Sequence, residues 1–518
     1  MTGMTGMAGT SEMSRRSFAA GAVGLAGAAA LGSLAQGALA SEKADKKGAA
    51  SGSAASGASA SAGASDEYDV IVLGGGGAGL AAAVEAADAG ATVLVLEKNT
   101  VTGGTTSVSQ GLIGGYDTYV QKAQGVKLTY EQMYDNLAAN ASYRLDPELM
   151  GITVEKSGES IDWLHERCDV PFQDKAVVGY GPYEMMHVVD GAGAALTDAL
   201  AKAAEAAGVT ILLSAQAVEL EMDDGRVEGV KALVDGAPRE FDCRRGVVIA
   251  TGGYSMNVEL AARFTPEVAG TIGIGHPMAT GDGIVMAANA GACTSHTDSM
   301  MCVLKDYTIM TEGTPTSAAA NVNGFTSLPN MIMVGADGAR FYNEDAKGYM
   351  SQDLNRPVFD QMHKDGLGYV WMVSDQAAVD ATGGKTKRGE DREYPSGDSA
   401  EALAEAIGVD AAGLAASIDA YNAAVDAGFD PECGRQPTQR LEPPFVALPV
   451  TPCSIITYGG IARDKNAQVI RADGTTIGGL YCAGETSCNS AFMGFTISNA
   501  ITWGRIAGAG AAAEKPRG

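Results

Sequence analysis

The sequence predicts an α/β fold that is built around a βαβ unit near the start of its folded part. The stretch YDVIVLGGGGAGLAAAVEAADAGATVLVLEKN opens with an apolar run, Val70–Leu73, passes through glycines into an alanine-rich helix, and reaches a second apolar run, Thr92–Leu96. Strand, glycine turn, helix and second strand in this order are typical of a nucleotide-binding parallel sheet. A chain of 518 residues with 46% hydrophobic content can bury a large core, and its length predicts two or three domains.

The glycines of this unit have the spacing that accommodates a pyrophosphate. Gly74, Gly76 and Gly79 form a G-x-G-x-x-G pattern, and Glu97 follows at the end of the second strand. Glycines let the backbone approach a pyrophosphate at the helix N-terminus, where N–H groups favour an anion. Glu97 is placed to accept hydrogen bonds from ribose hydroxyls. This pattern alone leaves NAD and FAD as alternatives.

The first 65 residues predict an export signal and a linker. The segment SRRSF, residues 14–18, precedes an uncharged Gly/Ala-rich run that ends in ALA at Ala40, which is typical of a twin-arginine signal. A buried or membrane-spanning helix is the alternative, and the glycines of this run disfavour it. Residues 41–65 lack apolar periodicity and predict a flexible linker. We therefore expect a signal at 1–40 and a protein located in the periplasm or on the outer face of the cytoplasmic membrane.

Charge and cysteine content argue against several function classes. The net charge of −26 repels phosphate backbones, so we expect no nucleic-acid partner. The eight cysteines occur singly, without CxxC or CxxCH, so neither a metal site nor a c-type haem is predicted. Their spacing selects no disulfide pair.

Several ordered motifs resemble the flavoprotein family of fumarate reductase and succinate dehydrogenase, which includes 3-ketosteroid dehydrogenases. They are GGTTSVSQGLIGG after the acid, VVIATGGY, ATGDGIVMAANAGA, GARFYNED, PPFVALPV and GGLYCAGETSCNSAFMGFTISNAITWGRIAG. The resemblance runs from about Asp66 to the C-terminus and favours FAD. It implies a Rossmann-like FAD-binding domain assembled from both chain ends, residues 66–300 and 446–518, with an inserted α+β capping domain at 301–445.

The resemblance also implies the cofactor contacts and the electron partner. The implied FAD contacts are Gly74, Gly76, Ala78, Gly79, Glu97, Gly104, Thr105, Ala217, Gly460, Glu485 and Ile501. The block after Thr105 has no histidine where membrane-bound relatives attach flavin, so we expect non-covalent FAD. The haem-binding and FMN-binding modules of exported relatives are missing from the sequence. We therefore expect a separate electron donor or acceptor, such as a cytochrome, an FMN-binding protein or a quinol-linked membrane partner.

The chain departs from the family where fumarate reductases bind a dicarboxylate. Ile455 and Ile456 replace two histidines in IITYGG, Phe495 replaces a C-terminal arginine, and Gly348 or Tyr349 falls on the proton-donating arginine. Burying unpaired carboxylates against apolar side chains costs several kcal/mol each, so fumarate should be a poor substrate. The substitutions favour an enone, a steroid-like ketone or an arylacrylate.

Another side chain must move the proton in the absence of the arginine. Tyr458 and Tyr349 are the predicted catalytic residues, because ketosteroid dehydrogenases use tyrosines for this step, and Tyr116 is a predicted pocket residue. An ordinary core aromatic is the alternative for each. We expect packing or helix-end roles for His276 and His296.

The expected activity is reduction of an activated C=C bond by hydride from flavin N5 and a proton. The alternatives are a ketosteroid-type dehydrogenase and a flavin electron-transfer component.

Overall fold

The computed structural model describes residues 66–141, 143–268, 270–311, 322–326, 328–344, 356–382, 393–489 and 494–517. The predicted signal and linker and the predicted catalytic Tyr349 lie outside the described residues. Their assignments stay predictions.

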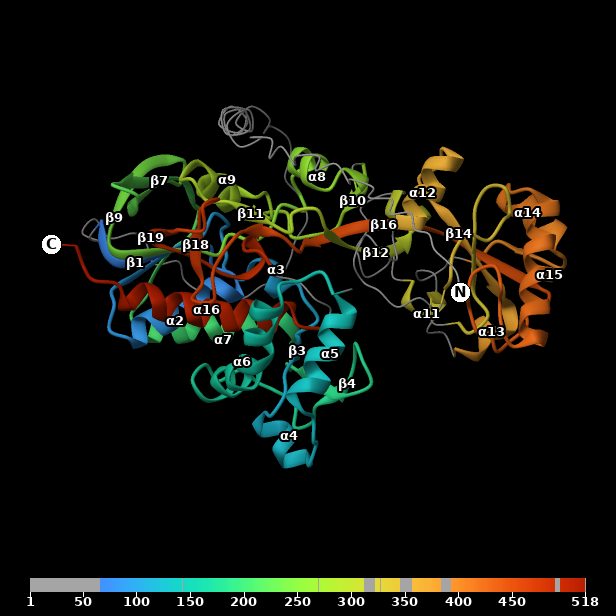
Figure 1. Ribbon diagram of the computed structural model, residues 1–518, viewed down its shortest axis with the longest axis horizontal. Helices are drawn as coiled ribbons and strands as arrows, with labels where there is room; N and C mark the ends of the chain where they lie inside the picture. The colour runs from blue at the N-terminus through green and yellow to red at the C-terminus, as the bar shows by residue number, and fades with distance from the viewer. Residues whose placement is uncertain are drawn as a thin grey trace, which may run out of the picture. The chain divides into compact units, whose positions relative to one another are not determined.

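The main sheet combines strands from both ends of the described chain (Figure 1). β1 (Glu67–Leu73) lies between β2 (Val93–Leu96) and β9 (Ala237–Ile249), and all three are parallel. β19 (Thr476–Cys482) pairs in parallel with the other side of β9. The remaining strands of this sheet are β6 (Thr210–Leu212), β7 (Ala215–Asp223), β8 (Arg226–Val234) and β18 (Gln468–Ile470). The prediction of a nucleotide-binding sheet with strands from both chain ends is confirmed.

Three helices pack together beside the main sheet. α2 (Gly77–Asp88) contacts both α7 (Ala192–Ala206) and the C-terminal helix α16 (Thr496–Ala513). α16 can approach α2 closely because Gly504 and Gly508 have no side chains. A methyl group on Gly504 would overlap the Ala78 carbonyl oxygen, and one on Gly508 would overlap that of Ala82. The C-terminal segment is thereby fixed against the helix that follows the glycine turn.

A second sheet is organised around the long strand β16 (Phe445–Thr457). Its first half pairs with β14 (Val370–Asp375) and its second half with β12 (Met300–Asp306), both antiparallel. The other strands are β10 (Ile272–Gly273), β13 (Ile332–Val334) and β15 (Ser396–Gly397). The helices of this region are α10 (Tyr307–Thr311), α11 (Asn323–Thr326), α12 (Arg356–Asp365), α13 (Gln376–Ala381), α14 (Ala400–Ile407) and α15 (Ala411–Ala427). A separate capping sheet is confirmed, while the domain boundaries stay a prediction.

A three-stranded sheet and two helices form a third layer below the main sheet in Figure 1. Its strands are β3 (Leu112–Gly114), β4 (Val177–Val178) and β5 (Glu184–Val188), and its helices are α5 (Tyr130–Asn140) and α6 (Pro147–Glu166). The shorter elements are α3 (Gly104–Ser107), α4 (Tyr119–Gln124), α8 (Val258–Phe264), α9 (Asp282–Asn289), β11 (Thr294–Ser295), β17 (Gly460–Ile461), and the 3₁₀ turns η1 (Pro266–Val268) and η3 (Gly484–Thr486).

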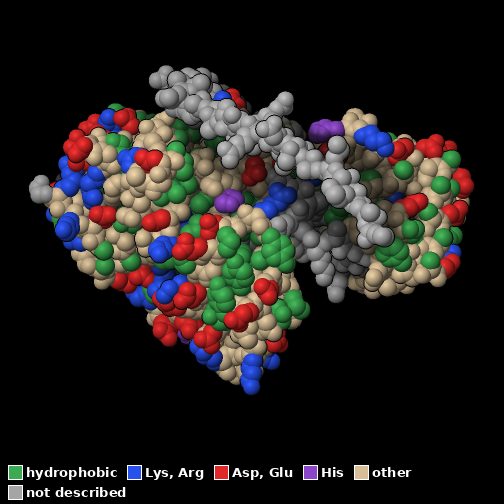
Figure 2. Space-filling model, in the orientation of Figure 1, with side chains coloured by type: hydrophobic (Ala, Val, Ile, Leu, Met, Phe, Trp, Pro, Cys, Tyr) green, Lys and Arg blue, Asp and Glu red, His purple; other side chains and the backbone are tan. Residues whose placement is uncertain are grey.

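Acidic and basic side chains are distributed over the visible surface (Figure 2). Hydrophobic side chains gather over β3, α5 and β4, where Val177 and Val178 are exposed. Within the described ranges, no helix combines the length and apolar character that a membrane span requires.

Candidate active site

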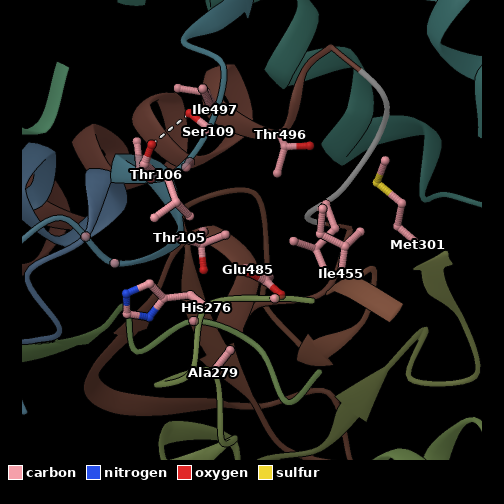
Figure 3. A pocket seen from close by; sticks show the side chains of 18 of the residues that line it. Thr105, Thr106, Ser109, His276, Ala279, Met301, Ile455, Glu485, Thr496 and Ile497 are labelled. Atoms are coloured by element: carbon pink, nitrogen blue, oxygen red, sulfur yellow. Dashed lines mark hydrogen bonds between the residues drawn. The ribbon is translucent and has the colours of Figure 1, made fainter. Parts of the chain in front are cut away.

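A cavity of about 1110 Å³ extends from the carboxyl ends of the main-sheet strands to the second sheet. We call one part the nucleotide end, lined by Gly74, Gly76, Ala78, Glu97, Thr105, Ala217, His276 and Glu485. We call the other part the second-sheet end, lined by Met301, Cys302, Val303, Leu304, Lys305, Val322, Met331, Met333, Glu344, Ile455 and Ile456. Figure 3 shows the first group around Thr105, His276 and Glu485, with Met301 and Ile455 on the other side.

The glycine turn leaves an open cradle at the start of α2. Gly76 is the N-cap residue in an extended conformation, and no side chain caps the helix. A methyl group on Gly76 would find only the Gly103 carbonyl oxygen, at 3.8 Å. A methyl group on Gly79 would overlap the Gly74 carbonyl oxygen, so Gly79 permits the turn itself. The free helix N-terminus and the open space before Gly76 suit a pyrophosphate.

Glu97 is held in place at the end of β2. Its Oε2 accepts a hydrogen bond from the Gly75 N–H at 2.7 Å, and its Oε1 accepts one from the Asn99 N–H at 2.7 Å. A carboxylate has about four acceptor positions, so capacity remains for ribose hydroxyls. The acid is therefore oriented before any nucleotide binds.

Glu485 is a buried carboxyl group on the cavity wall. Burial raises its pKa to about 7, and its Oε1 accepts a hydrogen bond from the Thr457 N–H at 2.9 Å. Thr457 ends β16, so this contact joins the second sheet to η3. The wall at Glu485 is only partly charged near neutral pH.

The structure brings most of the predicted cofactor residues to the cavity. The lining residues are Gly74, Gly76, Ala78, Glu97, Gly104, Thr105, Ala217 and Glu485. Gly79, Gly460 and Ile501 do not line it, and they support the wall from behind. A methyl group on Gly460 would overlap the Thr486 carbonyl oxygen, and Ile501 is fully buried in the core beside α2. The open helix N-terminus at Gly76, the oriented carboxylate of Glu97 and the buried carboxyl group of Glu485 meet at one cavity, and together they suit the polar groups of FAD.

The second-sheet end is predominantly apolar. Ile456 lies opposite Met301 in the ladder between β16 and β12, and Ile455 also lines the wall. Glu344 contributes a carboxylate, but this group is fully buried and ion-paired with Arg340 at 2.7 Å and Arg435 at 3.3 Å. Both isoleucines line this cavity, and their contact with a substrate stays a prediction.

The predicted aromatic residues do not line this cavity. Tyr458 and Phe495 are 1% and 0% exposed and pack in one buried cluster with Met301 and Ile456. Tyr458 follows β16, its backbone N–H donates to the Ser299 carbonyl at 3.2 Å, and its side chain is absent from the lining of the cavity. Tyr116 lines a different cleft of about 490 Å³. The catalytic and substrate roles of these residues stay predictions.

Sequence reasoning missed Tyr180, which lines the cavity. Its backbone has a φ of +55°, in the left-handed region that a bulky residue seldom adopts. The side-chain amides of Asn136 and Asn140 both donate to its carbonyl oxygen, at 3.2 and 2.7 Å. A methyl group on Gly494 would lie 2.7 Å from the Tyr180 ring, so the ring packs against that glycine. The run GYGPY between two extended segments was the available signal.

Lys305 and His276 were also missed as cavity residues. Lys305 lies in β12, where no motif of the sequence analysis falls, and burial lowers its pKa. For His276 the prediction is a packing or a helix-end role; the structure places it on the lining of the nucleotide end, where burial lowers its pKa. Lys305 is the one basic side chain at the second-sheet end among the lining residues that the structure describes.

The comparisons with known proteins agree with this geometry. A family model described as an FAD binding domain matches residues 69–496. A probable fumarate reductase of Shewanella frigidimarina is 30% identical over 467 residues, which cover 87% of this chain and 76% of the relative. A vinyl phenol reductase of Lactiplantibacillus plantarum is 29% identical, with coverage of 81% and 90%.

A solved structure is also similar to this chain. The 3-ketosteroid-Δ4-(5α)-dehydrogenase of Rhodococcus jostii RHA1, in complex with 4-androstene-3,17-dione, has a TM-score of 0.72 at 25% identity, and the match covers 88% of this chain and 99% of that chain. The chain belongs to the FAD-binding family of the fumarate reductase and succinate dehydrogenase flavoproteins, and it is an FAD-dependent oxidoreductase acting on CH–CH groups.

Proposed function

We propose that the protein reduces the activated C=C bond of a substrate with an apolar body and at most one negative charge. An enone, a steroid-like ketone and an arylacrylate meet this description. The observation that carries the proposal is the second-sheet end of the cavity, where Met301, Val303, Leu304, Ile455 and Ile456 form the wall. Among the described lining residues there is no arginine to hold a carboxylate in the bidentate manner that a dicarboxylate requires.

The charges at this end favour one class of substrate over another. Glu344 is ion-paired with Arg340 and Arg435, so its negative charge is offset and these two arginines are engaged with it and not with a substrate anion. Lys305 can pair with one carboxylate or donate to one carbonyl oxygen. A second carboxylate would be buried against apolar side chains at a cost of several kcal/mol. The wall therefore favours singly charged or neutral substrates over fumarate.

Bound FAD supplies hydride transfer at N5 of the flavin, which is the chemistry common to the family. The residues of this chain position the alkene and provide the proton at its α-carbon. Tyr180 is the tyrosine that lines the cavity among the described residues, and Asn136 and Asn140 fix its backbone. We assign the proton to Tyr180, with Tyr458 and Tyr349 as the alternatives.

Two of the similar proteins are compatible with a substrate that is not a dicarboxylate, whereas others are fumarate reductases. The vinyl phenol reductase and the ketosteroid dehydrogenase are named for aromatic and steroid substrates. The similarity to the ketosteroid dehydrogenase also favours a second candidate function, in which the protein introduces a C=C bond into a ketone. Reduction of a dye by a saturated ketosteroid, without turnover in the reductive direction, would select that candidate.

The test is reoxidation of the viologen-reduced protein under anaerobic conditions. We expect a cyclic enone or a 4-hydroxycinnamate to reoxidise the flavin faster than fumarate does. Lys305→Met should raise KM for the cinnamate and leave KM for the uncharged enone nearly unchanged. Reoxidation by fumarate alone would overturn the proposal.

We also propose that a twin-arginine signal exports the protein, which would place it in the periplasm or on the outer face of the cytoplasmic membrane. Non-covalent FAD and a separate electron partner, such as a cytochrome, an FMN-binding protein or a quinol-linked membrane protein, belong to the same proposal. The arginine pair Arg15 and Arg16 in the sequence supports the export signal. Replacing both with lysine should retain the protein in the cytoplasm, and flavin released by acid precipitation would support non-covalent attachment.

A further inference from the structure

Three methionine side chains line the second-sheet end of the cavity. Met301 lies on β12, Met333 lies on β13, and Met331 immediately precedes β13. None of the three is more than 8% exposed. No aromatic residue is found among the described residues that we assign to this end. A ligand bound there therefore meets aliphatic carbon and thioether sulfur, and not another ring.

The methionines belong to two separate buried clusters. Met301 packs in one cluster with Ile456, and it is drawn in Figure 3 on the side of the cavity away from His276. Met331 and Met333 pack in another cluster. Thioether groups therefore reach this end from two parts of the wall and not from a single patch.

A buried ion pair holds the backbone of two of these methionines. The N–H of Met333 donates to Glu344 Oε1 at 2.9 Å, and the carbonyl oxygen of Met331 accepts a hydrogen bond from Arg435 Nη1 at 2.6 Å. Glu344 and Arg435 are themselves ion-paired at 3.3 Å. The backbone is thereby fixed, while each unbranched side chain keeps three rotatable bonds with which it adapts to a ligand.

Thioether sulfur distinguishes an aromatic ring from a saturated ring of similar size. Sulfur is polarisable and makes favourable contacts with an aromatic ring at a distance of about 5 Å. One such contact corresponds to a gain of about two- to tenfold in affinity. Aliphatic carbon, such as that of Ile455 on the same wall, supplies hydrophobic burial for either kind of ring.

We propose that Met301, Met331 and Met333 select a substrate with an aromatic ring over one with a saturated ring. The inference rests on the proposed function and narrows its substrate class to an alkene that carries an aryl group. Lys305 lines the same end and can pair with one carboxylate. An arylacrylate therefore matches both features of this end, whereas a steroid-like ketone matches neither the sulfur atoms nor the cation as well.

The test uses two ligands without a C=C bond, so that binding is measured apart from reaction. They are 3-phenylpropionate and 3-cyclohexylpropionate, which share their charge and chain length and differ in the ring. The Kd of each ligand is measured by calorimetric titration of the holoprotein with oxidised FAD. The ratio of the cyclohexyl Kd to the phenyl Kd reports selection of the aromatic ring.

Leucine variants remove the sulfur at nearly constant side-chain volume. Met301→Leu and Met333→Leu should each lower this ratio by about two- to tenfold. Met372→Leu is the matched control, because Met372 is fully buried in the same cluster as Met333 and does not line the cavity. The control should keep the wild-type ratio. A wild-type ratio in both cavity variants would overturn the proposal.

A second measurement uses the wild-type holoprotein and does not depend on the folding of a variant. Methionine methyl groups are labelled with carbon-13 and observed by NMR during titration with each ligand. Saturation with 3-phenylpropionate should shift methionine methyl signals by the ring current of the bound aryl group, and the cyclohexyl ligand should not produce these shifts. The absence of any shift that is specific to the phenyl ligand would contradict the proposal.

Failure of this inference can be distinguished from failure of the proposed function. If 4-hydroxycinnamate reoxidises the reduced flavin but the ratio is the same in the wild type and both cavity variants, only selection by the methionines is refuted. If neither a cinnamate nor an enone reoxidises the flavin, the proposed function fails, and this inference fails with it.

Discussion

Alanine substitutions of Gly76 and Gly79, two glycines of the same turn, should affect FAD binding and protein stability differently. A methyl group on Gly76 would meet only the Gly103 carbonyl oxygen, at 3.8 Å, and the backbone of Gly76 is extended, so alanine fits without strain. The methyl group would occupy the cradle where the pyrophosphate approaches α2. Loss of one hydrogen bond to a charged group costs about 1.5–3 kcal/mol, which corresponds to a roughly ten- to hundredfold higher Kd for FAD.

Gly79→Ala is the matched comparison. Its methyl group would overlap the Gly74 carbonyl oxygen, and relief of this overlap moves the turn against the helix. Overpacking of this kind costs about 1–3 kcal/mol of stability, and the better helix propensity of alanine returns up to about 1 kcal/mol. We expect Gly79→Ala to lower the stability of the protein without FAD, whereas Gly76→Ala should leave it nearly unchanged.

The assay combines FAD titration of the apoprotein, followed by flavin fluorescence, with thermal melting in the absence of FAD. Gly76→Ala should fold and bind FAD weakly. A Gly76→Ala variant with wild-type affinity would refute the assignment of this cradle to the pyrophosphate. Equal loss of stability in both variants would refute the separation of the two roles.

Three further predictions follow from buried groups. The pKa of Glu485 rises from 4.5 to about 7 on folding, so the native state binds more protons than the unfolded state between these two pH values. The free energy of unfolding therefore falls as the pH rises through this window, by roughly 3 kcal/mol in total. The Glu485→Gln apoprotein should show a flatter pH dependence of this free energy in urea unfolding. Glu344→Gln leaves Arg435 without its carboxylate and should destabilise the second-sheet region by roughly 3–5 kcal/mol, seen as faster hydrogen exchange there. Tyr180→Phe should lower kcat by about 10²–10⁴-fold with FAD binding unchanged, and Tyr183→Phe is the control; full activity of Tyr180→Phe would transfer the role to another residue.

The nucleotide end could be predicted from the sequence because its signals are local. Gly74, Gly76 and Gly79 act within one turn, and Glu97 follows at the end of the next strand, so spacing along the chain fixes their geometry. The strands from the C-terminus joined the same sheet as expected, since an apolar run at β19 can extend the parallel arrangement beside β9.

The second-sheet end depends on contacts between distant strands, which spacing does not encode. Ile456 lies opposite Met301 only because β16 and β12 pair with a register shift near that position. Tyr458, two residues later, donates its backbone N–H to the Ser299 carbonyl and does not line the cavity. Tyr180 reaches the cavity from a loop that Asn136 and Asn140 hold, and the run GYGPY indicates a turn there but not its contact with the cavity.

The pairing of β12 with β16 helps to make the cavity wall apolar, and this apolar wall underlies the proposed substrate preference. Met301 and Ile456 face each other across one ladder, and both belong to the cluster that buries Tyr458 and Phe495. A histidine at position 456 alone would be placed against methionine and aromatic carbon, where its charged form has no partner and its pKa would fall. Binding of a dicarboxylate would therefore require coordinated changes on both strands and a new cation near Phe495. The apolar wall is a property of the whole packed cluster, and for this reason we expect the preference for a substrate with little charge to withstand single substitutions.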